Sequence, residues 1–173
     1  MSNEVIRVLK ERRSIRGYRP EPVPEGTLNE ILDAGIWSPT GRGAQNPLIV
    51  AVKDEDTLAQ LRRMNGEVLG SSADPYYGAP HIFLVFSPTD GHTYIEDASC
   101  VLTYMMVAAK SLGVDTCWVH REREMFGTDE GKALKTKWGI PEKYEGIGSL
   151  AVGYAKEAAP APAARKPDYV RWV

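Results

Sequence analysis

Apolar residues along this chain fall into blocks, some with the spacing of a helix and others nearly continuous. The first spacing places apolar side chains on one face of a helix, and the second is typical of a buried strand. Helical spacing predicts helices over residues 3–12, 24–36, from 54 onward, over 94–112 and over 128–138. Continuous apolar runs predict strands over residues 48–52, 82–86, 114–119 and 147–154.

Two segments show neither pattern. Residues 65–80 are rich in Gly, Ser, Asp and Pro, which predicts a long loop between a helix and a strand. Residues 155–166 are rich in Ala and Pro, so they favour an extended linker, and residues 168–173 return to strand-like content. We therefore expect residues 156–173 to form an extended C-terminal arm, which either embraces a partner chain or folds back on its own.

Length and composition predict a single domain over residues 1–173. The chain has 173 residues, of which 43% are hydrophobic and 25% are charged, as in ordinary globular proteins. The helix predicted over residues 94–112 is apolar around most of its circumference, so we expect it to be buried on nearly all sides, partly against a second subunit. The order of helices and interspersed strands favours an α/β layered domain.

Charge and targeting signals argue against two kinds of partner. Lys and Arg number 21 against 23 Asp and Glu, a net charge of −2, so no basic field would attract nucleic acid. The N-terminus lacks an apolar signal core, and no run approaches the roughly 18 apolar residues of a membrane span. We therefore expect a cytoplasmic protein that binds neither nucleic acid nor membrane.

Two segments predict a phosphorylated, planar cofactor. Residues 12–16, Arg-Arg-Ser-Ile-Arg, follow a helix-like stretch, and the planar donor fork of arginine suits phosphate oxygens at any physiological pH. Residues 38–45, Ser-Pro-Thr-Gly-Arg-Gly-Ala-Gln, form a Gly-rich loop whose backbone can approach a flat heterocycle closely. The alternative is that the arginines only end a solvated helix, where cations complement the helix dipole.

Side chains that carry out catalysis by themselves are few. The three histidines, His81, His92 and His120, have no metal-ligand spacing to another His, Cys or carboxylate, so we expect no metal site. Cys100 and Cys117 lie in apolar runs and are expected to be reduced and buried. Rossmann, P-loop and serine-hydrolase motifs are absent. We therefore expect a cofactor to carry the reaction.

Seven motifs taken in order give a resemblance to a known family. They are Arg-Arg-Ser-Ile-Arg-Gly-Tyr (12–18), Pro-Val-Pro-Glu (22–25), the Gly-rich loop (38–45), Gly-Val-Asp-Thr-Cys-Trp-Val-His-Arg (113–121), Lys-Trp-Gly-Ile-Pro (137–141), Gly-Ile-Gly-Ser-Leu-Ala-Val-Gly-Tyr (146–154) and Arg-Lys-Pro (165–167). With them the chain resembles the nitroreductase family of flavin-dependent oxidoreductases, from about residue 4 to its end.

The resemblance implies a nitroreductase-like α+β fold, with a central β-sheet flanked by helices. It also implies a homodimer with two FMN sites at the subunit interface. In this dimer, each chain would extend its C-terminal arm onto the other. The implied activity is ping-pong transfer of reducing equivalents from NADH or NADPH to an electron-poor small molecule, such as a nitroaromatic or quinone-like acceptor.

The resemblance further implies which residues hold FMN. For the phosphate and ribityl chain they are Arg12, Ser14, Arg13 beside them, and Arg165, with Lys166 as second choice. For the ring, Arg16 is the cation near the N1/O2 edge. The loop from the other subunit contributes Pro39, Thr40, Gly41 and Gln45. The strand whose backbone faces the ring contributes Cys117, Trp118 and Val119.

Two departures from the family pattern limit what carries over. Gly43 stands where many members have Asn, and His120 with Arg121 where many have a Gly pair. His120 is therefore a candidate proton donor or substrate contact, with an ordinary loop histidine as the alternative. Two other functions stay open: a specialised flavin enzyme of the same fold (flavin-fragmenting, dehalogenating or ene-reducing), and a flavin-binding or storage protein with little turnover.

Overall fold

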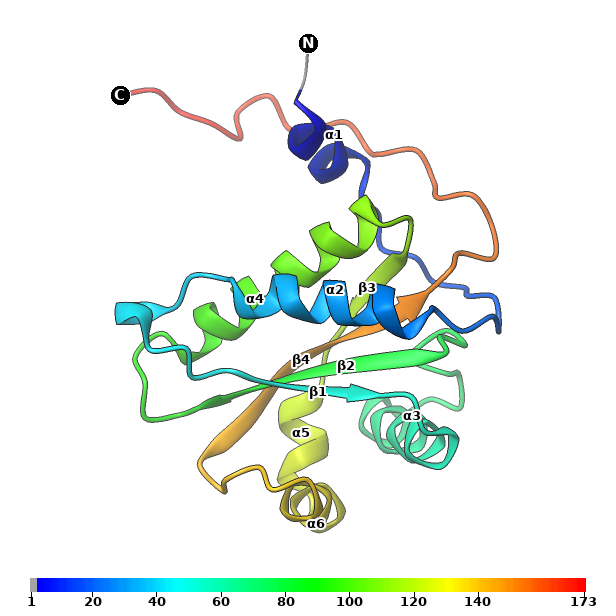
Figure 1. The fold of residues 1–173 in the computed structure, drawn as a ribbon, viewed down its shortest axis with the longest axis vertical. Coiled ribbons are helices and arrows are strands. Elements are labelled where there is room, and N and C mark those ends of the chain that lie inside the picture. The colour runs from blue at the N-terminus through cyan, green and yellow to red at the C-terminus, as the bar shows by residue number, and fades with distance from the viewer. Residues whose placement is uncertain (1–2) are drawn as a thin grey trace.

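The computed structural model describes residues 3–173, which form a four-stranded antiparallel sheet with helices on both faces (Figure 1). The strand order across the sheet is β1-β2-β4-β3, with bounds β1 Leu48–Val52, β2 His81–Pro88, β3 Asp115–Val119 and β4 Tyr144–Gly153. The helices are α1 Glu4–Glu11, α2 Glu25–Ile36, the 3-10 turn η1 Gly41–Gly43, α3 Glu55–Leu69, α4 Tyr94–Ser111, α5 Glu122–Gly127 and α6 Asp129–Lys137. Helices α2 and α4 cover one face, and α3, α5 and α6 cover the other.

Strand β2 holds the two helical layers together. It lies between β1 and β4, and all of its residues are buried. Because side chains alternate across a strand, Ile82, Leu84 and Phe86 join the hydrophobic cluster of α3, α5 and α6, while Phe83 and Val85 join that of α2 and α4. Burial of each side chain of this size contributes about 1.5–3 kcal/mol. Each face of the sheet therefore has its own hydrophobic cluster, and strand β2 contributes side chains to both.

Several helix boundaries follow from capping residues. The side chains of Asn3, Asp54 and Thr128 accept a backbone N–H at 2.8, 2.9 and 3.0 Å and so begin α1, α3 and α6. Gly70 ends α3 with a φ of 68°, a left-handed conformation that favours glycine.

All four predicted strands are present, and their antiparallel pairing gives the α+β arrangement rather than an alternating α/β layering. The loop predicted over residues 65–80 is wrong in its first part, because α3 continues to Leu69. Asn65 is fully buried there and Gly66 is buried beside it, so packing overrides their low helix propensity. Helix α5 was not predicted.

Within one chain, helix α4 leaves Ile95 and Tyr104 41% and 43% exposed, so its burial against a second subunit stays a prediction. The expectation about the chain end needs correction. Residues 168–173 form no strand, and Trp172 is 95% exposed, because no strand edge of the same chain lies beside them. Both features concern surfaces that one chain leaves uncovered.

Cys117 is buried as predicted, whereas Cys100 is only half-buried, and both are free thiols. Among residues 3–173, no helix combines the length and the apolar composition needed to cross a membrane. Within the same range, no group of three or more His, Cys, Asp and Glu side chains is placed to hold a metal ion.

Gly131 and Gly26 make a matched pair of tests for the packing of α6. A Cβ on Gly131 would lie 2.2 Å from the Met125 carbonyl oxygen and 2.5 Å from the Phe126 Cα, whereas one on Gly26 would meet nothing within 4 Å. We predict that Gly131→Ala lowers the free energy of unfolding by roughly 2 kcal/mol or more, and that Gly26→Ala leaves it unchanged or raises it by up to about 1 kcal/mol. Urea unfolding measures both, and equal stabilities for the two variants would contradict the α5–α6 contact.

Candidate functional site

The arginine segment, residues 12–16, is fixed at the outer edge of β3. Ser14 pairs with Thr116 in a parallel bridge, and the Ile15 N–H donates to the Thr116 carbonyl at 3.1 Å. Ile15 is 5% exposed and belongs to the cluster that α3, α5 and α6 cover. Because side chains alternate along an extended segment, Ser14 and Arg16 point away from that cluster.

The three arginines of this segment serve different purposes. Arg13 donates from one terminal nitrogen to the carbonyls of Lys10 and Arg12, at 2.7 and 2.6 Å, and so satisfies the end of α1. Arg12 and Arg16 have no side-chain hydrogen bond or ion pair within residues 3–173. The helix-end interpretation therefore fits Arg13, and two guanidiniums remain available to an anion.

A cavity of about 430 Å³ opens beside the arginine segment. Ser14, Arg16 and Gly17 line it from one side, and Lys156 and Glu157 from the other. The Lys156 N–H donates to the Gly17 carbonyl at 3.0 Å, which holds the two sides together. The cavity thus has a hydroxyl and two cationic side chains against one carboxylate, a set that suits phosphate or carboxylate oxygens.

The backbone of β3 borders the same region. Cys117, Trp118 and Val119 pair with β4 along one edge of the strand, and within the described residues the other edge is paired only at Thr116. The outward backbone groups of residues 117–119 are therefore open to a ligand. Burial raises the pKa of the Cys117 thiol, which makes it a packed, protonated side chain and not a nucleophile. Trp118 is half-buried.

The Gly-rich loop is clamped to the start of α4. The Gly41 N–H donates to the Asp97 carboxylate at 2.8 Å, and the Thr93 hydroxyl donates to the same carboxylate at 3.2 Å. A Cβ on Gly41 would lie 2.2 Å from the Thr93 hydroxyl oxygen, so only glycine permits this approach. Within the loop, the Gln45 N–H donates to the Thr40 hydroxyl at 3.0 Å. These hydrogen bonds hold the loop against α4 within the single chain.

The arginine segment and the Gly-rich loop do not meet within one chain. Thr40 and Gln45 line a cavity of about 200 Å³ that is separate from the one beside Arg16, and Pro39 is exposed. In Figure 1, η1 lies at the far left and the chain after α1 lies on the right, with α2 and α4 between them. The two predicted halves of the site are therefore apart.

The C-terminal arm leaves the body of the protein after a bridge between Ala155 and Tyr18. Residues 157–173 are exposed and run along the outside of the molecule past α1 (Figure 1). The cavity beside Arg16 is lined by residues up to Pro160, and not by Arg165 or Lys166. The predicted phosphate ligands of the arm are thus not at that cavity in the same chain.

A buried polar network behind the end of β3 was not predicted. Glu122 is 1% exposed, and its Oε1 accepts hydrogen bonds from the hydroxyls of Ser149 and Tyr76. Burial raises the pKa of Glu122 to about 7. Asn65 of α3 joins the network by donating to the Tyr76 hydroxyl at 3.3 Å. Glu122 lies in the run Glu-Arg-Glu, which has the composition of a solvated helix, so no sequence signal marked it.

His120 lies in front of this network, at the start of the turn that follows β3. Its side chain is exposed and makes no hydrogen bond within the described residues, while its carbonyl accepts from Asn65 at 3.0 Å. The imidazole is therefore free to meet a ligand, and its part in the chemistry stays a prediction.

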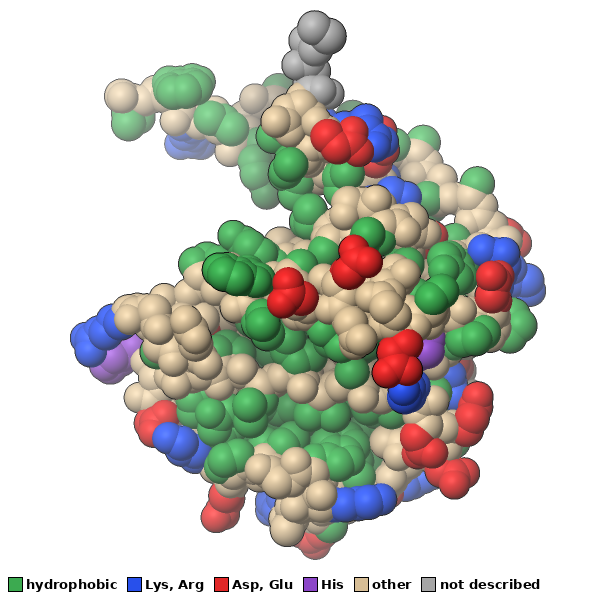
Figure 2. Space-filling view, viewed as in Figure 1, with side chains coloured by type: hydrophobic (Ala, Val, Ile, Leu, Met, Phe, Trp, Pro, Cys, Tyr) green, Lys and Arg blue, Asp and Glu red, His purple; other side chains and the backbone are tan. Residues whose placement is uncertain are grey.

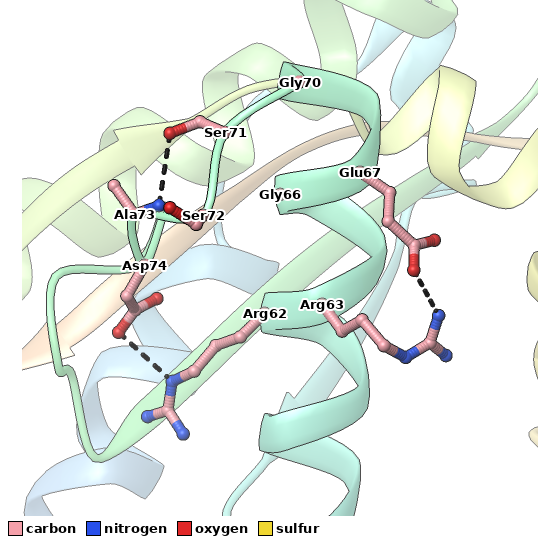
Figure 3. Close-up of a pocket in the computed structure, with 9 residues that line it drawn as sticks. All are labelled: Arg62, Arg63, Gly66, Glu67, Gly70, Ser71, Ser72, Ala73 and Asp74. Carbon is pink, nitrogen blue, oxygen red and sulfur yellow. Dashed lines mark hydrogen bonds and ion pairs between the residues drawn. The ribbon is translucent and has the colours of Figure 1, made fainter.

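A larger cavity, of about 620 Å³, lies between α3 and the loop that follows it (Figure 3). Two arginines line it, but Arg62 pairs with Asp74 at 3.3 Å and Arg63 pairs with Glu67 at 2.8 Å. Because each cation already has a carboxylate partner, this cavity offers no free positive charge to a phosphate group.

Comparison with known proteins gives a consistent result. A model of the nitroreductase family matches residues 9–154. The structure of a nitroreductase with bound FMN from Bacteroides fragilis resembles this chain with a TM-score of 0.91 and 28% sequence identity, over 99% of this chain and 100% of that one.

Two relatives extend the comparison. A protein of Archaeoglobus fulgidus, named for NADH dehydrogenase and NAD(P)H nitroreductase activity, is 25% identical over 159 residues, which cover 89% of this chain and 87% of the relative. Iodotyrosine deiodinase of Nematostella vectensis is 26% identical over an aligned length of 198 residues, gaps included, and the alignment takes in 96% of this chain and 73% of that enzyme.

The raised pKa of Glu122 predicts a specific dependence of stability on pH. Its pKa in the folded chain is about 7, above the ordinary value of 4.5, so the proton favours the folded state. This contribution is complete below pH 4.5 and is lost as the pH rises through about 7, and it amounts to about 3 kcal/mol. We predict that Glu122→Gln removes this loss.

Urea unfolding between pH 4.5 and 8.5 tests the prediction. The difference in free energy of unfolding between Glu122→Gln and the unaltered chain should grow with pH. Glu124→Gln, at an exposed position of the same helix, is the control and should give a constant difference. A constant difference for Glu122→Gln as well would show that Glu122 does not titrate in this range.

Proposed function

This chain belongs to the nitroreductase family, and on that premise we propose that it uses bound FMN to pass reducing equivalents from NADH or NADPH to an electron-poor small molecule. Nitroaromatic and quinone-like compounds are the acceptors that we propose, and the two half-reactions would take place in turn at one open face. The observation that carries the proposal is a pair of guanidiniums, Arg12 and Arg16, which have no partner within residues 3–173 and flank Ser14 at the open edge of β3.

The residues at this edge fit FMN. Arg12 and the Ser14 hydroxyl would hold the phosphate and ribityl chain, and the backbone of residues 117–119 would face the ring. Arg13 would contribute less, because one of its nitrogens is engaged at the end of α1. FMN, when bound, supplies the acceptance and donation of hydride.

Arg16 would provide a permanent positive charge near the pyrimidine edge of the ring. A guanidinium stays protonated at all physiological pH values, so it stabilises negative charge there without gaining or losing a proton. Its side chain forms no ion pair within residues 3–173, although Glu157 lines the same cavity, so the guanidinium is available to a ligand.

We propose that a second copy of the chain completes the site. In one chain, the Gly-rich loop with Pro39, Thr40, Gly41 and Gln45 lies apart from the arginine segment. A partner's loop, held against α4 through its contact with Asp97, would supply the missing contacts to the ring. Each dimer would then hold two equivalent sites between its chains.

The exposed hydrophobic surface supports such a dimer. Val5 on α1, Trp37 after α2 and Tyr104 on α4 are 58%, 76% and 43% exposed. Figure 2 shows hydrophobic side chains on the arm, on α1 and near the end of α2, on either side of an open groove. Exposed apolar surface of this extent is typical of an interface.

The arm would cross to the partner in this arrangement. Residues 157–173 are exposed, and Tyr169 and Trp172 are 83% and 95% exposed. The exchanged arm would bury these rings on the partner and bring Arg165, with Lys166 beside it, toward the partner's phosphate site.

A dehalogenating reaction on the same fold is the second candidate. The likeness to iodotyrosine deiodinase extends over 96% of this chain, so a halogenated aromatic acceptor belongs in any test of function. His120 is exposed beside the open edge of β3 and would be available as a proton donor in either reaction.

The proposal predicts a yellow protein with about one FMN per chain that is dimeric in solution and oxidises NADH or NADPH when an acceptor is present. Absorbance, light scattering and steady-state kinetics measure these properties, with a nitroaromatic, a quinone, an enone and a halogenated aromatic as acceptors. Turnover of the halogenated compound alone would favour the second candidate, and slow oxidation with every acceptor would favour flavin storage. A colourless monomer that takes up no FMN would overturn the proposal.

Arg12→Ala tests the phosphate ligand directly. A charge-assisted hydrogen bond contributes about 1.5–3 kcal/mol, so we predict a roughly 10- to 150-fold loss of FMN affinity. Arg63→Ala is the control, because Arg63 lies on α3, where it pairs with Glu67 and Glu130. This variant should leave the affinity for FMN unchanged. Fluorescence titration of the apoprotein measures both, and equal affinities for the two variants would remove Arg12 from the site.

A further inference from the structure

The turn after β3 has a conformation that its sequence does not favour. The strand ends at Val119, and His120 and Arg121 then lead into α5. Arg121 has a φ of 89°, in the left-handed region that residues other than glycine rarely adopt. No side chain caps the N-terminus of α5. Contacts from another part of the chain therefore stabilise the turn.

Asn65, in α3, supplies those contacts. Its Nδ2 donates to the His120 carbonyl at 3.0 Å, and its Oδ1 accepts from Nε of Arg121 at 2.8 Å. A guanidinium only donates and a carbonyl only accepts, so the two partners fix which end of the amide faces each of them. One fully buried side chain thus binds both residues of the turn.

The buried network in turn fixes the Asn65 amide. Nδ2 also donates to the Tyr76 hydroxyl at 3.3 Å, and Tyr76 donates to Glu122 at 3.4 Å. The Ser149 hydroxyl donates to the same Glu122 oxygen from β4. Tyr76, Glu122 and Ser149 are all buried, so water does not compete for these bonds. Helix α3, the loop that follows it, helix α5 and strand β4 are therefore joined in one network, which reaches the Asn65 amide through Tyr76.

We propose that Asn65 is a positioning residue for the flavin site. By holding the His120–Arg121 turn, it sets where the last backbone groups of β3 lie against the ring. The inference rests on the proposed function, because it takes residues 117–119 to face FMN. It follows from chain connectivity: the turn continues directly from Val119, so a change in its dihedral angles displaces the end of the strand.

Two variants test the proposal. Asn65→Leu keeps a side chain of similar size but removes both hydrogen bonds to the turn. The double variant Asn65→Leu/Arg121→Gly relieves the strained φ of the turn and leaves no guanidinium to satisfy, because glycine adopts positive φ freely; only the His120 carbonyl then lacks its donor. The measurements are FMN affinity, by titration of apoprotein, and the midpoint potential of the FMN-loaded protein.

We expect Asn65→Leu to raise the dissociation constant for FMN by about threefold to tenfold, the equivalent of losing one net hydrogen bond. We also expect the substitution to weaken the binding of oxidised FMN and of reduced FMN to different extents. A threefold difference between them corresponds to a shift of about 14 mV in the two-electron potential. The double variant should return both quantities to within about twofold of the unaltered chain, or within about 9 mV.

Leu61→Val separates positioning from packing. Leu61 lies one turn earlier on α3, is fully buried, and makes no polar contact. This variant should lower the stability of the chain and leave the potential unchanged. If Asn65→Leu behaves in the same way, with lower stability and an unchanged potential, Asn65 is only a core residue and the proposal is wrong.

The remaining outcomes also decide the matter. A potential that shifts in Asn65→Leu and is not restored by Arg121→Gly would show that the effect does not pass through the turn. If Asn65→Leu does not fold, a double variant that folds and binds FMN normally supports the proposal, and one that also fails overturns it. An unaltered chain that binds no FMN would instead overturn the proposed function, so the two failures are distinguishable.

Discussion

The pairing of Ser14 with Thr116 is the contact on which the rest of the site depends. Helix α1 has a single buried residue, Val8, so the helix alone would place the arginines loosely. The bridge and the burial of Ile15 fix the segment on the sheet edge, and burial of one such side chain contributes about 1.5–3 kcal/mol. The same contact ends one residue before Cys117, which leaves the backbone of β3 beside the guanidiniums and open.

One chain does not bring the arginine segment and the Gly-rich loop together. The sheet places the arginine segment and β3 together, and helix α4 holds the Gly-rich loop elsewhere through Asp97. Each part is held to its own element by backbone hydrogen bonds, so the two stay apart within one chain. In the dimer that we propose, a second chain would bring them together, and a ligand that binds only the assembled state would also stabilise that dimer.

The sequence was informative where one local pattern decides the structure. Continuous apolar runs located all four strands, of which β2 and most of β4 are buried, and the Ala/Pro composition located the arm. Local pattern could not show which guanidinium is free: Arg12 and Arg13 are neighbours, and only the position of the carbonyls at the end of α1 separates them. It also could not find Asn65, whose partner His120 lies 55 residues away and whose neighbours suggested a loop.

The members of the buried network depend on one another, as the carboxyl of Glu122 shows. Burying a carboxyl is unfavourable, and a well-packed apolar residue is often more stable in such a place. Replacing Glu122 alone, however, would leave the buried hydroxyls of Tyr76 and Ser149 without their acceptor, at a cost of about 1–3 kcal/mol for each. The Tyr76 hydroxyl would then be free to turn toward other partners, and Asn65 would lose one of the contacts that orient its amide. The main effect of the Glu122 carboxyl is therefore to keep the turn in one orientation, and its effect on stability is secondary.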